Sequence, residues 1–226
     1  MAKQWLQRVF GQFGEIEMDN EHLPLIAILR GITLPEVEPI ANVLFESGIR
    51  YIEIPLNSPD PFPSIEALVE LYGDRALCGA GTVTTLDEVD RLVECGGKLS
   101  VSPHTDARLI KAGLDKNLVV FPGVATITEA MTAIGAGATC LKLFPAGDLG
   151  VGYLKSINAV IPAHIPIFAV GNIGLEDLPS FWRAGARGFG IGGGVYQPGL
   201  PVVEVRELAC QYVAAVKELV EEERNG

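Results

Sequence analysis

Residues 139–145 read Thr-Cys-Leu-Lys-Leu-Phe-Pro, an apolar run that predicts a short buried strand with Lys142 at its centre. An ammonium group in an apolar strand is costly unless it is paired or loses its proton. A lysine whose pKa is lowered in this way is a nucleophilic amine, the group that forms Schiff bases with ketones. The run therefore predicts both a buried strand and carbonyl chemistry.

The same pattern of a short apolar strand followed by an amphipathic helix recurs on both sides of this run. The expected strands are 25–29, 51–54, 76–80, 99–102, 118–121, 140–144, 165–170 and 188–191. The expected helices are 35–47, 64–72, 86–95, 105–112, 126–134, 152–160, 175–182 and 203–222. Eight such units, with strands apolar on both faces, predict an α/β protein with a (β/α)8 TIM barrel. A doubly wound open sheet is the alternative, but the first strand is not followed by a GxGxxG motif.

The chain of 226 residues suits a single domain, which we expect to be the barrel over 21–226. Residues 1–20 are expected to form an N-terminal helical extension that packs across the bottom of the barrel. The net charge of −11 argues against nucleic-acid binding and against anionic membranes. Four dispersed cysteines and the lack of a long apolar run predict a cytoplasmic protein with reduced thiols.

The alternation of side chains along a strand predicts which polar groups enter the barrel. Ile52 and Ile54 are expected to face the helices, so Glu53 points inward. The same parity turns Lys142 inward, and Arg30 ends the inward face of the first strand. Since active sites of such barrels lie at the carboxyl ends of the strands, these three ionisable groups are expected to converge on one mouth.

Each of these groups has a purely structural interpretation beside the functional one. Lys142 and Glu53 would form either a buried salt bridge or an amine nucleophile with its general acid/base. Arg30 would either bind a substrate carboxylate or pair with a neighbouring acid on the rim. Thr82, after Gly79-Ala80-Gly81, would either contact a ligand or cap the next helix.

Two further loops have the composition of an anion site. Gly171-Asn172 follows the seventh strand and Gly192-Gly193-Gly194 follows the eighth, where barrels often bind phosphate. The three histidines are isolated from other ligand-type residues, so the sequence predicts no metal site.

From residue 23 to residue 196 the sequence resembles the family of aldolases that cleave 2-keto-3-deoxy-6-phospho sugar acids. The resemblance rests on five segments, which are Ala-Ile-Leu-Arg-Gly at 27–31, Glu-Ile-Pro-Leu-Asn-Ser at 53–58, Gly-Ala-Gly-Thr-Val at 79–83, Leu-Lys-Leu-Phe-Pro-Ala at 141–146 and Phe-Ala-Val-Gly at 168–171. It implies a class I aldolase on a (β/α)8 barrel, with no metal or other cofactor, that is usually a homotrimer.

The resemblance also implies roles for residues at matching positions. Lys142 is similar to the Schiff-base lysine and Glu53 to the general acid/base. Arg30 and Thr82 are similar to contacts of the pyruvyl carboxylate. The loops at Gly171 and at Gly192–Gly193 resemble the phosphate site, so pyruvate and a phosphorylated 2-keto-3-deoxy sugar acid are the implied ligands.

Within that family the sequence resembles the 6-phosphogalactonate branch more than the gluconate branch. The gluconate-type enzymes typically have Glu-Val-Thr-Leu-Arg-Thr at strand two and a threonine near the end of strand seven, where this chain has Val170. The branches differ at the C4 hydroxyl, and a valine removes a hydrogen-bond partner there. The alternatives are the gluconate epimer, 4-hydroxy-2-oxoglutarate or other unphosphorylated substrates, and a non-catalytic phosphosugar-binding barrel.

Two departures from the family pattern concern the phosphate end. The usual Gly-Gly after strand seven is Gly171-Asn172 here, and the usual Gly-Ser after strand eight is Gly192-Gly193. The second change deletes a hydroxyl donor, and the side chain of Asn172 is a candidate replacement.

Overall fold

The computed structural model describes residues 22–225, without the side chain of the last of these. Its strands are β1 (Leu25–Ile28), β2 (Tyr51–Pro55), β3 (Leu77–Gly81), β4 (Leu99–Val101), β5 (Val119–Phe121), β6 (Gly123–Val124), β7 (Leu141–Leu143), β8 (Ile167–Val170) and β9 (Ala186–Ile191). Its helices are α2 (Leu34–Glu46), α3 (Pro61–Tyr72), α4 (Leu86–Glu94), α5 (Ala107–Asp115), α6 (Ile127–Gly135), α7 (Ala146–Leu149), α8 (Val151–Asn158), the 3-10 helix η1 (Leu175–Asp177), α9 (Leu178–Arg183) and α10 (Val202–Asn225). The expected N-terminal extension, 1–20, lies outside the described residues.

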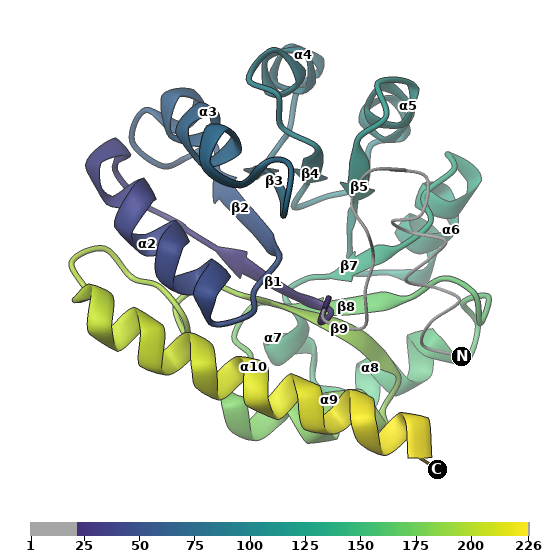
Figure 1. Ribbon diagram of the computed structural model, residues 1–226. Helices are drawn as coiled ribbons and strands as arrows, with labels where there is room; N and C mark the ends of the chain where they lie inside the picture. The colour runs from purple at the N-terminus through teal and green to yellow at the C-terminus, as the bar shows by residue number, and fades with distance from the viewer. Residues whose placement is uncertain (1–21, 226) are drawn as a thin grey trace.

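The strands form one parallel sheet in the order β5-β4-β3-β2-β1-β9-β8-β7-β6. The two strands at the ends of this order, β5 and β6, are separated in sequence by Pro122 alone. They are the two halves of the fifth barrel strand, so the sheet closes on itself with the helices around it (Figure 1). The predicted (β/α)8 barrel is confirmed.

The fifth strand was predicted over 118–121, and β5 covers Val119–Phe121, but the sequence did not predict that the strand continues as β6 after Pro122. Proline has no N–H group, so the strand donates no backbone hydrogen bond at Pro122, the residue that separates β5 from β6. Its carbonyl oxygen still accepts from the backbone N–H of Lys142 at 2.9 Å. The first half of the strand therefore pairs with β4 and the second half with β7.

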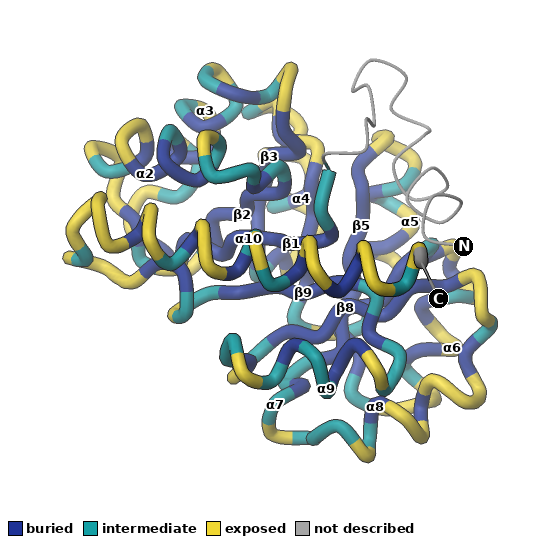
Figure 2. The backbone as a smooth tube through the Cα atoms, turned by 60° about the horizontal axis from the view of Figure 1, so that its bottom comes forward, coloured by how far each residue is buried: buried dark blue, intermediate teal, exposed yellow. Residues whose placement is uncertain are grey.

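Buried side chains separate into two apolar cores. The first contains helix residues together with the strand residues that face them, among them Ile52, Ile54, Leu141 and Leu143. The second contains strand residues almost exclusively and fills the barrel interior, with Ile26, Ile28, Tyr51, Phe168 and Val170 among its members. The strands are buried except at Arg187 of β9, whereas the outer faces of the helices are exposed (Figure 2). The predicted parity is thereby confirmed in strands one, two and six of the barrel.

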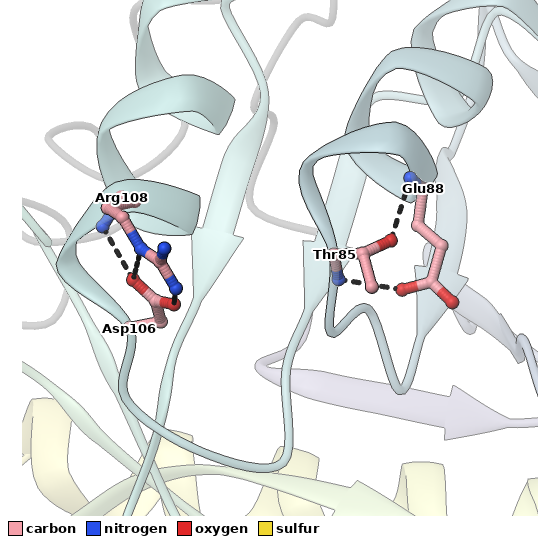
Figure 3. Close-up of polar contacts among 4 residues, drawn as sticks. All are labelled: Thr85, Glu88, Asp106 and Arg108. Atoms are coloured by element: carbon pink, nitrogen blue, oxygen red, sulfur yellow. Dashed lines mark hydrogen bonds and ion pairs between the residues drawn. The ribbon is translucent and has the colours of Figure 1, made fainter.

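Side-chain caps fix the starts of helices α4 and α5. At α4 the hydroxyl of Thr85 accepts from the Glu88 N–H at 3.2 Å, and the Glu88 carboxylate accepts from the Thr85 N–H at 2.9 Å (Figure 3). At α5 the carboxylate of Asp106 accepts from the backbone N–H of Arg108 at 2.8 Å. Because Asp106 is the cap, this helix begins at Ala107, two residues later than the sequence predicted.

Two other segments differ from expectation. The short helix α7 follows β7 directly, and Gly150, at a φ of 82°, separates it from α8. The predicted helix 175–182 is a 3-10 turn followed by α9. No helix within residues 22–225 is both long and apolar enough to cross a membrane.

Candidate active site

Lys142 lies at the centre of β7 with its side chain inside the barrel. Only 6% of its surface is exposed, and its Nζ atom lies 4.9 Å from the centroid of the Phe144 ring. Burial lowers the pKa of the Lys142 amine, and the charge of Arg30 lowers it further, while the charge of Glu53 opposes both. Burial of the Lys142 side chain therefore increases the share of its neutral amine, the form that attacks carbonyl carbon.

Glu53 occupies the inward position at the middle of β2. It is 2% exposed, and its Oε2 atom has no hydrogen-bond partner. Burial raises the pKa of the Glu53 carboxyl to about 7, against the opposing charges of Lys142 and Arg30. Within the described residues no ion pair closer than 4.0 Å joins Glu53 to Lys142. A carboxyl with a pKa near 7 both donates and accepts protons at neutral pH.

Gly81, the last residue of β3, makes room for the Glu53 carboxyl group. A Cβ atom at Gly81 would lie 1.9 Å from Oε2 of Glu53. Atoms cannot approach so closely, so any side chain here displaces the carboxyl group. The site therefore requires glycine at position 81, because a residue without a side chain leaves space for the Glu53 carboxyl group.

We expect Gly81→Ala to lower kcat/KM by about 10²-fold, because a shift of about 1 Å in a reacting group has this effect. The matched control is Gly135→Ala, since a Cβ atom there meets nothing within 4 Å. Steady-state assays of both variants check the prediction, and near-wild-type activity of Gly81→Ala would contradict it.

Arg30 and Thr82 lie at the carboxyl ends of β1 and β3. Arg30 is exposed, and its Nη1 donates to Oδ1 of Asn57 at 2.6 Å, so its partner is a neutral amide and not a neighbouring acid. Thr82 has a φ of 57°, which is a strained conformation for a β-branched residue. The cap of the following helix is Thr85, so the capping interpretation of Thr82 was wrong.

Strand β8 ends at Val170, which lies inside the barrel and is 4% exposed, and the loop that follows begins at Gly171. Gly171 has a φ of 93°, and a Cβ there would lie 3.0 Å from the Phe144 ring. Asn172 also has a positive φ, 51°, which asparagine tolerates better than most residues. The backbone conformation therefore explains why asparagine can replace a glycine at this position.

The side chain of Asn172 already has a partner in this structure. Its Nδ2 donates to both carboxylate oxygens of Asp148, at 2.9 and 3.1 Å. Asp148 belongs to α7, which follows the Lys142 strand. The Asp148 carboxylate therefore already accepts the hydrogen bonds that the Asn172 amide was expected to donate to phosphate.

The loop after β9 turns sharply at its glycines. The N–H groups of Val195 and Tyr196 both donate to the Gly192 carbonyl, at 2.9 and 3.0 Å. The side-chain amide of Gln197 donates to the carbonyl of Gly193 at 2.9 Å. Gly192 lies above Ile28 of the barrel interior, since a Cβ there would be 3.8 Å from the Cβ of Ile28.

The structure thus brings the predicted residues to one end of the barrel and adds others. The sequence assigned no role to Phe144, Asn57, Ser58 or Asp148, and it noted Gly81 without predicting its contact with Glu53. Phe144 lies two positions after Lys142, so the alternation of side chains could have predicted that it points toward the same face. The other contacts join separate strands or loops, so the local pattern could not reveal them. Within residues 22–225 no group of three or more His, Cys, Asp or Glu side chains is placed to hold a metal ion.

Comparison with protein families gives a match to the aldolase family described as KDPG and KHG aldolase, over residues 16–208. The chain belongs to this family. It is therefore an aldolase, a lyase.

Relatives within the family include both sugar-acid branches. The chain is 45% identical, over 85% of its length and 91% of the relative, to a probable 2-dehydro-3-deoxy-6-phosphogalactonate aldolase from Rhizobium meliloti (strain 1021). The solved native KDPGal structure matches with a TM-score of 0.86 and 43% identity, over 88% of this chain and 97% of that chain.

Two other solved structures are informative. A KDPG aldolase from Legionella pneumophila, with pyruvate captured at low pH as a covalent carbinolamine intermediate, matches with a TM-score of 0.76 and 27% identity, over 84% of this chain and 94% of that chain. A cube-shaped protein cage, designed by fusing symmetric oligomeric domains, matches with a TM-score of 0.87 and 41% identity, over 90% of this chain and 75% of that chain.

Proposed function

We propose that this aldolase cleaves 2-dehydro-3-deoxy-6-phosphogalactonate to pyruvate and D-glyceraldehyde 3-phosphate through a Schiff base on Lys142. The observation that carries the proposal is the burial of Lys142 beside Glu53 at the mouth of the barrel. The name of the relative from Rhizobium meliloti supports the substrate, and the carbinolamine in the Legionella pneumophila enzyme supports the covalent route.

In the proposed mechanism the neutral Lys142 amine attacks the C2 ketone and forms a carbinolamine. Protonated Glu53 gives its proton to the departing hydroxyl, so water leaves and an iminium forms. The Glu53 carboxylate then takes the proton of the C4 hydroxyl, and the electrons of the C3–C4 bond move into the iminium. The aldehyde departs, the resulting enamine is protonated at C3, and water releases pyruvate.

The remaining predicted residues bind the two ends of the substrate in this proposal. Arg30 and Thr82 contact the carboxylate of the pyruvyl part. The apolar side chain of Val170 lies near C4, where it offers no hydrogen bond to the hydroxyl that distinguishes the epimers. Gly171, Asn172, Gly192 and Gly193 form the phosphate end, with backbone N–H groups as the principal donors because Asp148 occupies the Asn172 amide.

One observation keeps a second substrate class in consideration. The Asp148 carboxylate next to the proposed phosphate site opposes a second anion electrostatically. This favours a substrate with less negative charge at that end, such as 4-hydroxy-2-oxoglutarate, whose second carboxylate carries one charge where a phosphate carries nearly two. A gluconate epimer differs only at C4. A non-catalytic phosphosugar-binding barrel would need neither a buried amine nor Glu53.

We expect kcat/KM for the 6-phosphogalactonate substrate to exceed that for its C4 epimer and for 4-hydroxy-2-oxoglutarate by about tenfold or more, because a polar group buried without its hydrogen-bond partner costs about 1 kcal/mol or more. Steady-state assays with the three compounds, together with borohydride trapping of pyruvate, check this. A preference for the unphosphorylated acid would assign the second class, and the lack of any adduct would refute the Schiff-base proposal.

We also infer a homotrimer in the cytoplasm. The designed cage supports a symmetric assembly, and α4 and α6 expose the apolar side chains Leu86, Val93, Ile127 and Met131. The four cysteines are free thiols, which agrees with a reducing compartment. The mass in solution tests the assembly.

A further inference from the structure

Two hydrogen bonds join the loop after β1 to the loop after β2. Nη1 of Arg30 donates to Oδ1 of Asn57 at 2.6 Å, and the N–H of Gly31 donates to Oγ of Ser58 at 2.9 Å. Ser58 is only 7% exposed, whereas Arg30 and Asn57 lie at the exposed rim. The contact therefore has a buried, fixed part and an outer part that holds the guanidinium.

The chemistry of the outer contact is unusual for a surface arginine. Within residues 22–225 Arg30 has no carboxylate within 4.0 Å, and Asn57 is the side chain that accepts its hydrogen bond. An amide oxygen orients a guanidinium without cancelling its charge, whereas an aspartate in the same place would do both. The positive charge of Arg30 is thus held in one direction and remains available to an anion.

That charge acts on the two buried groups of the site. The charged groups that affect Lys142 are Glu53, from β2, and Arg30, from the loop after β1. Arg30 lowers the pKa of Lys142 and also that of Glu53. Weakening its field therefore raises the pKa of both groups and leaves less neutral amine at a given pH.

We propose that Asn57 is a positioning residue for the aldol reaction, which holds the Arg30 guanidinium at the barrel mouth with its charge available to the substrate carboxylate. This inference rests on the proposed function, since it takes Arg30 as the carboxylate contact. Ser58 supports the same arrangement from beneath by fixing the backbone at Gly31, whose φ of 82° is in the left-handed region.

The substitution Asn57→Asp separates positioning from a merely structural role. Aspartate has the same shape and keeps the acceptor, so a structural role predicts wild-type behaviour. Positioning of a free charge predicts a KM for the keto-acid substrate about tenfold higher, the effect expected of a weakened charge-assisted hydrogen bond. It also predicts that the pH midpoint of borohydride trapping with pyruvate moves upward, with kcat largely retained above that midpoint.

The variant Asn57→Ala loses the acceptor without adding a charge. We expect a higher KM, of several-fold, with a smaller change of the midpoint than in Asn57→Asp. The matched control is Asn42→Asp in α2, because Asn42 also accepts a side-chain hydrogen bond, from the hydroxyl of Tyr72, far from the barrel mouth. Its KM and midpoint should equal those of the wild type.

The outcomes distinguish this inference from the proposed function. If wild-type protein forms no adduct with pyruvate, the proposed function fails and the inference fails with it. If the wild type forms the adduct but Asn57→Asp matches it in KM and in pH midpoint, only the positioning role of Asn57 is overturned. Thermal melts of each variant verify that the compared proteins are folded.

Discussion

Lys142→Met protein should form no borohydride-stable adduct with pyruvate and should lose aldolase activity by at least about 10⁴-fold, because the covalent nucleophile is removed. Methionine nearly matches the length of the lysine side chain and suits the apolar interior around Phe144 and Phe168. The substitution also removes an amine whose burial disfavours its charged form, so the fold should be retained or slightly stabilised.

The measurement is mass analysis of trapped peptides together with kcat/KM. Lys155→Met, at an exposed position of α8, is the matched control and should retain both the adduct and the activity. An adduct that persists in Lys142→Met protein would place the Schiff base on another amine. Activity without any adduct would instead refute covalent catalysis.

The residues that the sequence predicted correctly are those whose direction follows from the alternation within a single strand. Ile52 and Ile54 belong to the helix-facing core, which sets Glu53 inward, and Leu141 and Leu143 do the same for Lys142. Because parallel strands place their carboxyl ends together, Arg30, Thr82, Gly171 and Gly192 also follow once a barrel is assumed. These predictions need only the alternation of side chains along one strand and the rule that parallel strands place their carboxyl ends together.

What the sequence could not reveal depends on contacts between separate segments. The space that Gly81 leaves for Glu53 results from the register of β2 on β3. The hydrogen bond from Asn172 to Asp148 joins a loop to helix α7 across 24 positions, and the hydrogen bond from Arg30 to Asn57 spans 27 positions. In the unfolded chain such pairs are distant, and glycine and asparagine are common in loops because of their backbone conformations alone.

The break of the fifth strand is an intermediate case. Pro122 was visible in the sequence, and the rule that proline lacks a ladder donor was available. The strand nevertheless resumes at Gly123, because the Pro122 carbonyl still accepts from Lys142 and thereby keeps β6 against β7. Pairing with β7 thus extends the fifth barrel strand past Pro122, although proline would end the strand on local grounds alone.

Replacing Glu53 by glutamine should have opposite effects on activity and on stability. Turnover should fall by roughly 10²–10⁴-fold, since the amide can neither take the C4 hydroxyl proton nor supply one to the departing hydroxyl. The free energy of unfolding at neutral pH should increase, because glutamine has nearly the same shape without a buried charge. Steady-state assays and urea unfolding measure the two effects on the same protein.

The pH dependence of this stabilisation follows from the Glu53 pKa. The carboxyl pKa is about 7 in the folded protein and 4.5 ordinarily. Below pH 4.5 both states are protonated, so Glu53→Gln changes little. Between 4.5 and 7 the unfolded chain ionises while the folded protein retains its proton, so the wild type loses stability as pH rises. Above 7 the loss is constant, with a ceiling of about 3 kcal/mol.

The gain in the free energy of unfolding of Glu53→Gln should remain below about 3 kcal/mol, because the charge of Lys142 interacts with that of Glu53. The Glu53 charge raises the pKa of the Lys142 amine, so its removal makes protonation of that amine more costly. Glu70→Gln, at an exposed site of α3, is the control and should change neither activity nor stability. Equal stability of wild type and Glu53→Gln at pH 5 and at pH 8 would contradict a raised pKa, and with it the view that the site holds its acid/base at a cost to the fold.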